Sequence, residues 1–294
     1  NDDSIDATLE LQTISTEHLA FGRAVVILAK RNFQQRWARD PLSTLGVFAL
    51  RYLLIPVMFS ILLWDVGSDD PFFKNRSALL YVFGGSHLFT TFISTAVTFP
   101  NERHIIEGEI LSNQYSPLAY LAMQWLTVPL LEDLVGVCLN CLILKYCTGL
   151  NVAFGWLFLS TFVMSQAGIG YGTIFGLFRS IVIAAGLAVG CMLQMIFATG
   201  IVVTTEQMAR TRVFRAFEAM SLSRFAFLIA FDSELAESDA TTPFWGLYGF
   251  DNPSGWYRID LAWGLLVAWL IIMRVQALVM FQQQFRLALE KKKQ

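Results

Sequence analysis

The sequence predicts an all-α polytopic membrane protein with six transmembrane helices, an N-terminal interfacial connecting helix, a cytosolic coupling helix and a partly re-entrant outer segment before the last span. Of the 294 residues, 55% are hydrophobic and 15% are charged, whereas roughly a quarter of the residues of a soluble domain are charged. Apolar stretches of about 20 residues, the length that crosses a bilayer, recur along the chain. Most Lys and Arg residues that flank these stretches lie on the side of the two termini, so we expect both termini in the cytosol.

The N-terminal part of the chain is predicted to lie outside the bilayer. Residues 1–26 are polar and acidic, which is typical of a linker. Residues 27–41 predict an amphipathic connecting helix on the membrane surface, because Phe33 and Trp37 share one face and Lys and Arg side chains can reach lipid headgroups. A solvated helix without membrane contact is the alternative.

The membrane domain is predicted to cover residues 42–281. Its outer segment, residues 204–255, mixes Arg with aromatic side chains at helical spacing, and we expect part of it to enter the bilayer before the last span. Residues 282–294 are polar and are expected to form a cytosolic tail. The six predicted spans are residues 44–64, 77–99, 118–146, 153–178, 180–203 and 256–281.

The first and third predicted spans contain ionisable side chains that need a partner or access to water. Arg51 lies two turns into the first span, and we expect it to extend to the near interface in preference to forming a buried functional charge. Glu132 and Asp133 lie in the middle of the third span, where a carboxylate is costly unless it faces protein or water. The sequence leaves open whether these two acids form a buried hydrogen-bonded pair or mark a polar track.

Glycine and cysteine residues in the spans indicate close packing. Gly168, Gly172 and Gly176 repeat every four residues and predict a helix face that packs tightly against another helix. Cys138 and Cys141 form a C-x-x-C pattern inside a span without a second ligand pair nearby, so we expect these thiols to pack and to hold no metal.

The sequence contains no motif of an ATPase. A G-x-x-x-x-G-K-[ST] loop, whose backbone amides and Lys hold ATP phosphates, does not occur. The three His residues are scattered and match no catalytic arrangement. We therefore expect no catalytic residue in this chain, and the net charge of −2 gives no indication of nucleic-acid binding.

A polar interruption between the second and third predicted spans, residues 100–115, predicts a short cytosolic helix. Ile105, Ile106 and Ile110 supply an apolar side, and acidic residues supply a polar side. A charged helix held between two spans could transmit a force from the cytosol to both of them. A solvated loop is the alternative, although a loop would not need the isoleucines.

The residues of this interruption resemble a known family. The pattern F-P-x-E-R, followed by a Glu, then Y-S and a further Tyr, is similar to the membrane domain of G-subfamily (white/pigmented-drug-resistance type) ATP-binding cassette exporters. The matching residues are Phe99, Pro100, Glu102, Arg103, Glu109, Tyr115, Ser116 and Tyr120, whereas Asn113 stands where many members have Gly. The resemblance extends over most of the chain through Arg39-Asp40-Pro41, MIFATGIVV at residues 195–203 and SLSRFAF at residues 221–227.

The resemblance implies a transport function. This chain would be the transmembrane domain or subunit of an ATP-driven exporter of lipids, sterols or amphipathic small molecules, working by alternating access at a cavity on the axis of a homo- or heterodimer. ATP and Mg would lie on a nucleotide-binding domain, either upstream in the same polypeptide or in a separate subunit. The alternative is a non-transporting membrane scaffold or passive lipid scramblase with the same fold.

The resemblance also implies roles for particular residues and a location in the plasma membrane or an organelle membrane. An aromatic and apolar cavity suits flat amphipathic substrates, and β-branched side chains can close a dry gate. The implied coupling residues are Glu102, Arg103 and Glu109, the implied cavity residues are Ser86, Phe89, Leu193 and Ile196, and the implied hydrophobic gate consists of Ile201 and Val202.

Overall fold

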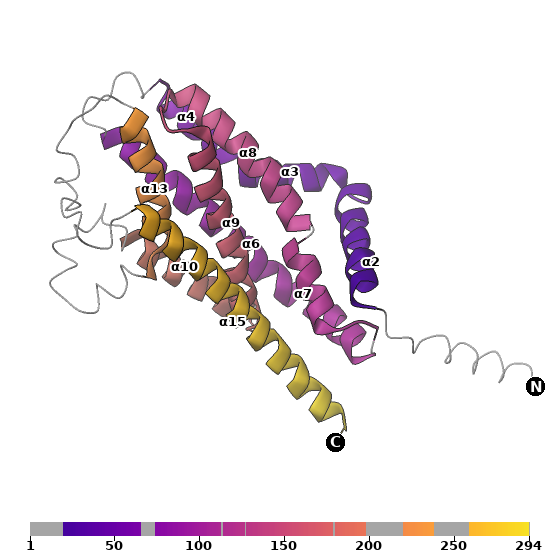
Figure 1. Ribbon diagram of the computed structural model, residues 1–294. Coiled ribbons are helices and arrows are strands. Elements are labelled where there is room, and N and C mark those ends of the chain that lie inside the picture. The colour runs from indigo at the N-terminus through magenta and orange to yellow at the C-terminus, as the bar shows by residue number, and fades with distance from the viewer. Residues whose placement is uncertain are drawn as a thin grey trace, which may run out of the picture.

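Helices form nearly all of the described structure (Figure 1). The computed structural model describes residues 20–65, 74–112, 114–126, 128–178, 180–197, 220–237 and 259–293, and these ranges contain no strand, which confirms the all-α prediction. The elements are α2 (Phe21–Phe33), the π-helical segment η1 (Gln34–Ala38), α3 (Pro41–Tyr52), α4 (Leu54–Leu62), α6 (Lys74–Leu111), α7 (Pro117–Leu126), α8 (Val128–Thr148), α9 (Phe154–Gly176), α10 (Ile181–Phe197), α13 (Leu222–Glu237) and α15 (Ile259–Lys293).

Helix α9 is the central element of the bundle, because it packs against α6, α8, α10, α13 and α15. Its contact with α6 is the most extensive among the described helices. At Gly172, an added Cβ would lie 2.5 Å from the Thr95 Cβ and 2.7 Å from the Phe92 carbonyl oxygen of α6. Gly168 and Gly176 meet α6 in the same way, so the predicted small-residue face is confirmed.

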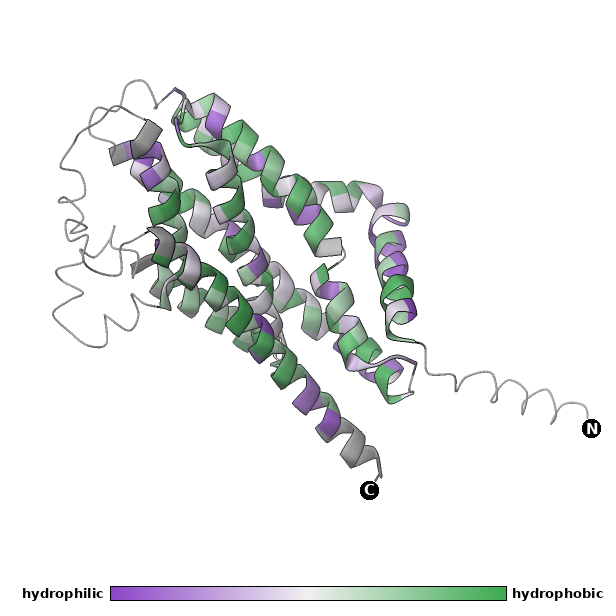
Figure 2. Cartoon of the chain, viewed as in Figure 1, coloured by the Kyte–Doolittle hydropathy of each residue, from purple (hydrophilic) through white to green (hydrophobic). Residues whose placement is uncertain are grey.

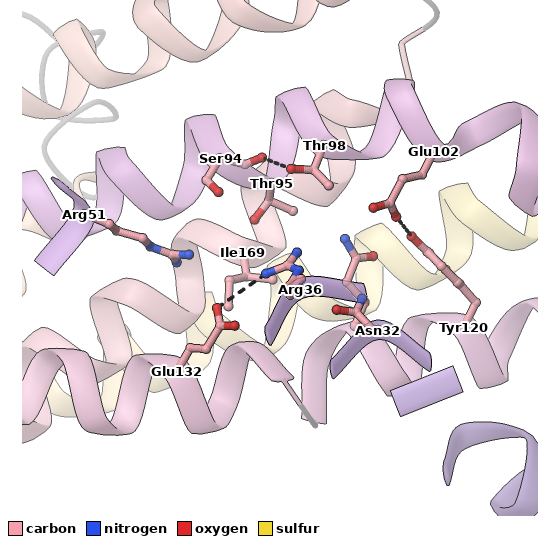
Figure 3. A pocket seen from close by; sticks show the side chains of 11 residues that line it. Asn32, Arg36, Arg51, Ser94, Thr95, Thr98, Glu102, Tyr120, Glu132 and Ile169 are labelled. Carbon is pink, nitrogen blue, oxygen red and sulfur yellow. Dashed lines mark hydrogen bonds and ion pairs between the residues drawn. The ribbon is translucent and has the colours of Figure 1, made fainter. Parts of the chain in front are cut away.

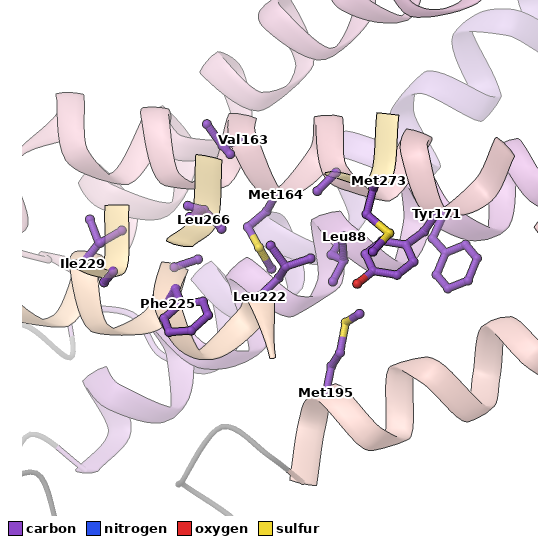
Figure 4. Packing of buried hydrophobic residues seen from close by; sticks show 14 of the residues in the cluster. Leu88, Val163, Met164, Tyr171, Met195, Leu222, Phe225, Ile229, Leu266 and Met273 are labelled. Carbon is purple, nitrogen blue, oxygen red and sulfur yellow. The ribbon is translucent and has the colours of Figure 1, made fainter. Parts of the chain in front are cut away.

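Three clusters of buried apolar side chains fill the bundle along its length. One lies among α4, α8, α13 and the starts of α6 and α9, and it contains Cys141. The second joins α6, α9, α10, α13 and α15, and Figure 4 shows the side chains of Met164, Met195 and Met273 within it. The third cluster lies at the opposite end, where α2, α7 and α15 surround the C-terminal end of α6.

Helix α13 is buried within the bundle. Its residues from Leu222 to Phe231 are all buried, and Glu234 forms an ion pair of 3.1 Å with Arg76 of α6. Glu234 also accepts a hydrogen bond of 2.6 Å from the backbone amide of Val152, just before α9. These bonds hold α13 against the first turns of α6 and α9. The rest of the segment predicted to be re-entrant lies outside the described residues.

Several described helices are suited to a membrane. In the described part of the chain, three helical stretches are long and apolar enough to cross a bilayer: Asn75–Pro100, Pro117–Thr148 and Leu261–Arg286. Helices α3 and α4 form a pair bent by 43° that would make a fourth span, and α10 contributes a shorter apolar stretch, Val182–Cys191. Figure 2 shows the apolar colouring along these helices. The chain is therefore an integral membrane protein by length and composition of its helices.

Two predicted helix boundaries differ from the structure. The connecting helix expected from Ile27 begins earlier, at Phe21, and continues through η1 to Ala38. The charged segment expected to form a separate short helix is instead the end of α6, which runs unbroken from Lys74 to Leu111 and contains Pro100. A change from apolar to charged side chains does not interrupt backbone hydrogen bonding, and the proline removes one backbone donor without ending the helix here.

Candidate functional site

The polar end of α6, which we define as residues 101–111, is bound to α2 through Glu109. Arg31 of α2 donates hydrogen bonds to both carboxylate oxygens of Glu109, at 2.5 and 3.1 Å, and the Tyr115 hydroxyl donates to the same carboxylate at 2.6 Å. A bidentate Arg–carboxylate pair fixes both distance and orientation. Burial raises the pKa of Glu109, but the hydrogen bonds from Arg31 and Tyr115 lower it by more, so this pKa lies below its ordinary value.

Glu102 and Arg103 bind the polar end of α6 to three more helices. The Tyr120 hydroxyl of α7 donates to Glu102 at 3.0 Å. Arg103 donates to the carbonyl oxygen of Leu177, directly after α9, at 3.0 Å. With the Gln284 amide oriented so that its oxygen faces Arg103, the guanidinium also donates to α15 at 2.5 and 3.0 Å. All three predicted coupling residues therefore join the polar end of α6 to neighbouring helices.

The apolar side of the same segment is anchored in the core. Ile106 is 2% exposed and Ile110 is 4% exposed, and both pack in the cluster that contains Phe281 of α15. Ile105, which was predicted on the same side, is 51% exposed. The polar end of α6 lies at the end of the bundle where α2 begins and α15 ends (Figure 1).

Asp133 of α8 is the centre of a buried hydrogen-bond network. Its carboxylate accepts hydrogen bonds from Arg51 at 3.0 Å and from the Tyr52 hydroxyl, both on α3. It also accepts from Ser165 at 2.8 Å and from Gln166 at 2.9 Å, both on α9. The carboxylate that joins α3, α8 and α9 is therefore fully satisfied.

Arg51 forms a buried ion pair, whereas the sequence favoured an extension of this side chain to the near interface over a buried charge. Its side chain is 14% exposed and forms an ion pair with Asp133, whose side chain is 0% exposed. An ion pair with further hydrogen bonds holds two charges inside apolar helices at a lower cost than either charge alone.

Glu132 does not take part in the Asp133 network. It accepts hydrogen bonds from the Trp37 indole at 3.2 Å and from Arg36 at 3.4 Å, both on η1. Consecutive residues of an α-helix point about 100° apart, so the two acids face different neighbours. The two acids do not form a hydrogen-bonded pair, because each carboxylate binds its own set of donors.

A polar pocket lies beside Glu132, between the connecting helix, α6, α7 and α8 (Figure 3). It has about 520 Å³ of space, part of which is open to the surroundings. A second hollow of about 650 Å³ shares several of its residues and extends toward α3. The first pocket is lined by Asn32, Arg36, Arg51, Ser94, Thr95, Thr98, Glu102, Tyr120, Gln124, Glu132 and Ile169.

The residues implied to line a substrate cavity lie elsewhere, on α6 and α10, which pack against each other. Ser86 and Phe89 of α6 are partly buried, and the Ser86 hydroxyl donates at 2.7 Å to a carbonyl oxygen one turn earlier in the same helix. Leu193 of α10 is 48% exposed. The remaining implied residues fall outside the described part of the structure: the side chain of Ile196, and Ile201 and Val202.

Sequence reasoning missed several partners in these networks, because they lie far away along the chain. Arg274 of α15 donates hydrogen bonds of 3.0 Å to the backbone and side-chain oxygens of Gln166, and its guanidinium lies 4.8 Å from the centre of the Trp125 ring. The available signal was the charge itself, since a cation inside an apolar run normally has an internal partner.

Comparison with known proteins agrees with a helical membrane domain. A protein-family model described as ABC-2 type transporter matches residues 23–234, which is more than half of the chain. A search of curated proteins finds no match. The matched range runs from α2 to α13 and includes the polar end of α6 together with the Asp133 network. This chain belongs to the ABC-2 type transporter family and is a membrane domain of an ABC-type transporter.

Proposed function

We propose that this chain is the six-span membrane domain of a G-subfamily type exporter, driven by ATP hydrolysis on a nucleotide-binding domain in the same polypeptide or in a separate subunit. Both termini lie in the cytosol, and the polar end of α6 receives the nucleotide-binding domain. The observation that carries this proposal is the set of bonds made by Glu102, Arg103 and Glu109, which join one charged helix end to four other helices.

The geometry explains how a force at the polar end of α6 reaches the membrane. Glu109 is held by a bidentate ion pair and Ile110 is buried, so this end cannot shift without moving α2 and α15. The same helix continues without a break as a predicted membrane span. A displacement on the cytosolic side therefore moves part of the transmembrane bundle directly.

The exposed face of α10 supports pairing of two membrane domains around an axial cavity. Val182 is 81% exposed, Ile183 is 54% exposed and Leu193 is 48% exposed. In this proposal, Leu193 and Ile196 line the cavity with Ser86 and Phe89, and the apolar lining suits sterols, lipids or amphipathic small molecules. Ile201 and Val202 form the gate toward the outside, since their side chains can part without breaking hydrogen bonds.

The experiment uses the chain assembled with its nucleotide-binding domain in sealed vesicles. Uptake of a fluorescent lipid is measured with ATP, with a non-hydrolysable analogue and without nucleotide, alongside ATP hydrolysis. Arg103→Ala is expected to abolish ATP-dependent uptake while ATP is still hydrolysed. Lys30→Ala, which removes an exposed cation of α2 at the same end, is the matched control and is expected to transport normally.

Two results would contradict the proposal. Normal ATP-dependent uptake by a folded Arg103→Ala protein would show that the polar end of α6 does not couple hydrolysis to transport. Lipid movement that is equal with and without nucleotide would indicate a passive scramblase.

A further inference from the structure

We propose that the polar pocket beside η1 binds a phospholipid whose headgroup carries both a phosphate diester and a primary ammonium group, as phosphatidylethanolamine does. The phosphate binds near Arg36 and Arg51, and the ammonium group binds among acceptor oxygens on the opposite side. The site is separate from the proposed axial cavity, and the inference does not depend on the transport function.

Unpaired polar atoms in the pocket specify this chemistry. Within the described part of the chain, buried atoms without a hydrogen-bond partner include Arg51 Nε, Asn32 Oδ1 and Gln124 Oε1, and all three residues line the pocket. An unpaired buried group costs about 1–3 kcal/mol. Arg51 Nε requires an acceptor, which a phosphate supplies, whereas the two amide oxygens require a donor, which a primary ammonium group supplies and a trimethylammonium group does not.

The charges that line the pocket are balanced. Arg36 and Arg51 are the cations, and Glu102 and Glu132 are the anions. Arg51 is already paired with Asp133, so the pocket lacks the positive excess that a headgroup with net negative charge would require. The Arg36–Glu132 contact is long, at 3.4 Å, and the Arg36 side chain is 38% exposed, so this guanidinium can accept a second anionic partner.

The pocket lies at the depth of lipid headgroups. The apolar stretch of α6 that is suited to span a membrane ends at Pro100. Ser94, Thr98 and Glu102 of the pocket lie within two turns of this end, where the hydrocarbon core gives way to the polar interface. Asn32 and Arg36 of the connecting helix form part of the pocket wall (Figure 3).

The adjoining hollow provides a path for acyl chains. It shares Arg36, Arg51 and Glu132 with the pocket and adds the apolar side chains of Val47 and Phe48 on α3. Val47 is 58% exposed, so the hollow leads outward along an apolar surface of α3. A polar pocket that continues into an apolar opening matches the shape of a single phospholipid.

The pocket and the proposed axial cavity use different faces of α6. At 3.6 residues per turn, the mean direction of Ser94 and Thr98 lies about 130° around the helix from that of Ser86 and Phe89. The lipid is therefore expected to stay bound between the connecting helix and the bundle and to occupy a site that the transported molecule does not use.

The test measures lipid binding to the delipidated, detergent-purified chain by native mass spectrometry. The probes are phosphatidylethanolamine, phosphatidylcholine and phosphatidylglycerol with identical acyl chains, and inorganic phosphate. Phosphatidylethanolamine is expected to bind about tenfold more tightly than phosphatidylcholine, since the unpaired amide oxygens lose their donor in the latter. Inorganic phosphate is expected not to compete.

Two substitutions identify the pocket. Arg36→Gln is expected to weaken phosphatidylethanolamine binding about tenfold, whereas Arg39→Gln, an exposed residue just after η1, serves as the matched control and is expected to leave it unchanged. Gln124→Leu is expected to reduce the preference for phosphatidylethanolamine over phosphatidylcholine without weakening phosphatidylcholine. This ratio is measured within one folded protein, so it stays informative if Arg36→Gln does not fold.

Equal binding of the two zwitterionic lipids by the wild-type chain would overturn the proposal. So would equal effects of the Arg36 and Arg39 substitutions, or an unchanged lipid preference in Gln124→Leu. Tighter binding of phosphatidylglycerol, or displacement of lipid by inorganic phosphate, would identify a simple anion site in place of the one proposed.

Discussion

Replacing Gly172 by Ala is predicted to destabilise the protein by forcing α6 away from α9. The added Cβ would lie 2.7 Å from the Phe92 carbonyl oxygen and 3.1 Å from the Ala96 backbone nitrogen. The nearest atom, the Thr95 Cβ, would lie 2.5 Å away, and ordinary contact requires about 3.5 Å, so the helices must separate by roughly 1 Å. Because neither a Cβ nor a backbone atom moves with the rotamer, no change of rotamer relieves the clash. Overpacking of this kind costs about 1–3 kcal/mol, and we expect the upper half of this range because a main helix contact is disturbed.

The assay is thermal unfolding of the purified protein in detergent micelles. At about 2–4 °C per kcal/mol, the melting temperature is expected to fall by roughly 5–10 °C. The control is Gly155→Ala in the first turn of the same helix, where no atom lies within 4 Å of the added Cβ. This variant is expected to keep or slightly raise the melting temperature, since Ala favours helix over Gly.

The comparison can refute the packing argument in two ways. If Gly172→Ala melts at the wild-type temperature, the close contact between α6 and α9 does not exist as described. If Gly155→Ala melts equally early, the effect comes from loss of glycine itself and not from the helix interface.

Three further predictions concern single side chains. Asp133→Ala leaves the Arg51 charge without its buried partner and is expected to cost about 3–5 kcal/mol, with partial recovery in the Asp133→Ala, Arg51→Met double variant; an unchanged melting temperature in the single variant would contradict this. Ile110→Ala is expected to cost about 2–4 kcal/mol, whereas Ile105→Ala at its exposed position is expected to change stability by less than about 0.5 kcal/mol. Similar losses of unfolding free energy for the two variants in chemical unfolding would contradict the burial pattern. The folded-state pKa of Glu109 is lowered, so its stabilising contribution is present above the ordinary carboxyl pKa of 4.5 and is lost as the pH falls through the folded pKa. The melting temperature of Glu109→Gln should therefore approach that of the wild type in acid. A difference between the two melting temperatures that stays constant with pH would refute the assignment.

Features that depend on local spacing could be predicted from the sequence. The four-residue repeat of Gly168, Gly172 and Gly176 defines one helix face, and that face packs against α6. Of the three isoleucines after Pro100 that predicted a buried side, Ile106 and Ile110 form it, whereas Ile105 is exposed. In both cases, helical periodicity alone determines which side chains lie together.

Features that depend on partners far along the chain could not be predicted. Arg51 and Asp133 are 82 residues apart, and no local pattern shows that their helices meet. The same holds for Arg31 and Glu109, which are 78 residues apart. The length of α6 was missed for a different reason, since a change of side-chain polarity at Pro100 suggested an end that the backbone does not have.

The length of α6 has a mechanical consequence. A helix of 38 residues extends for about 57 Å, nearly twice the thickness of the hydrocarbon core of a bilayer, so it projects from the membrane. Its glycine-mediated contact with α9, between Leu88 and Phe99, lies close to the middle of this length. A tilt about that contact would move the two ends by similar distances in opposite directions. Such a tilt of α6 would widen the bundle on one side of the membrane while narrowing it on the other.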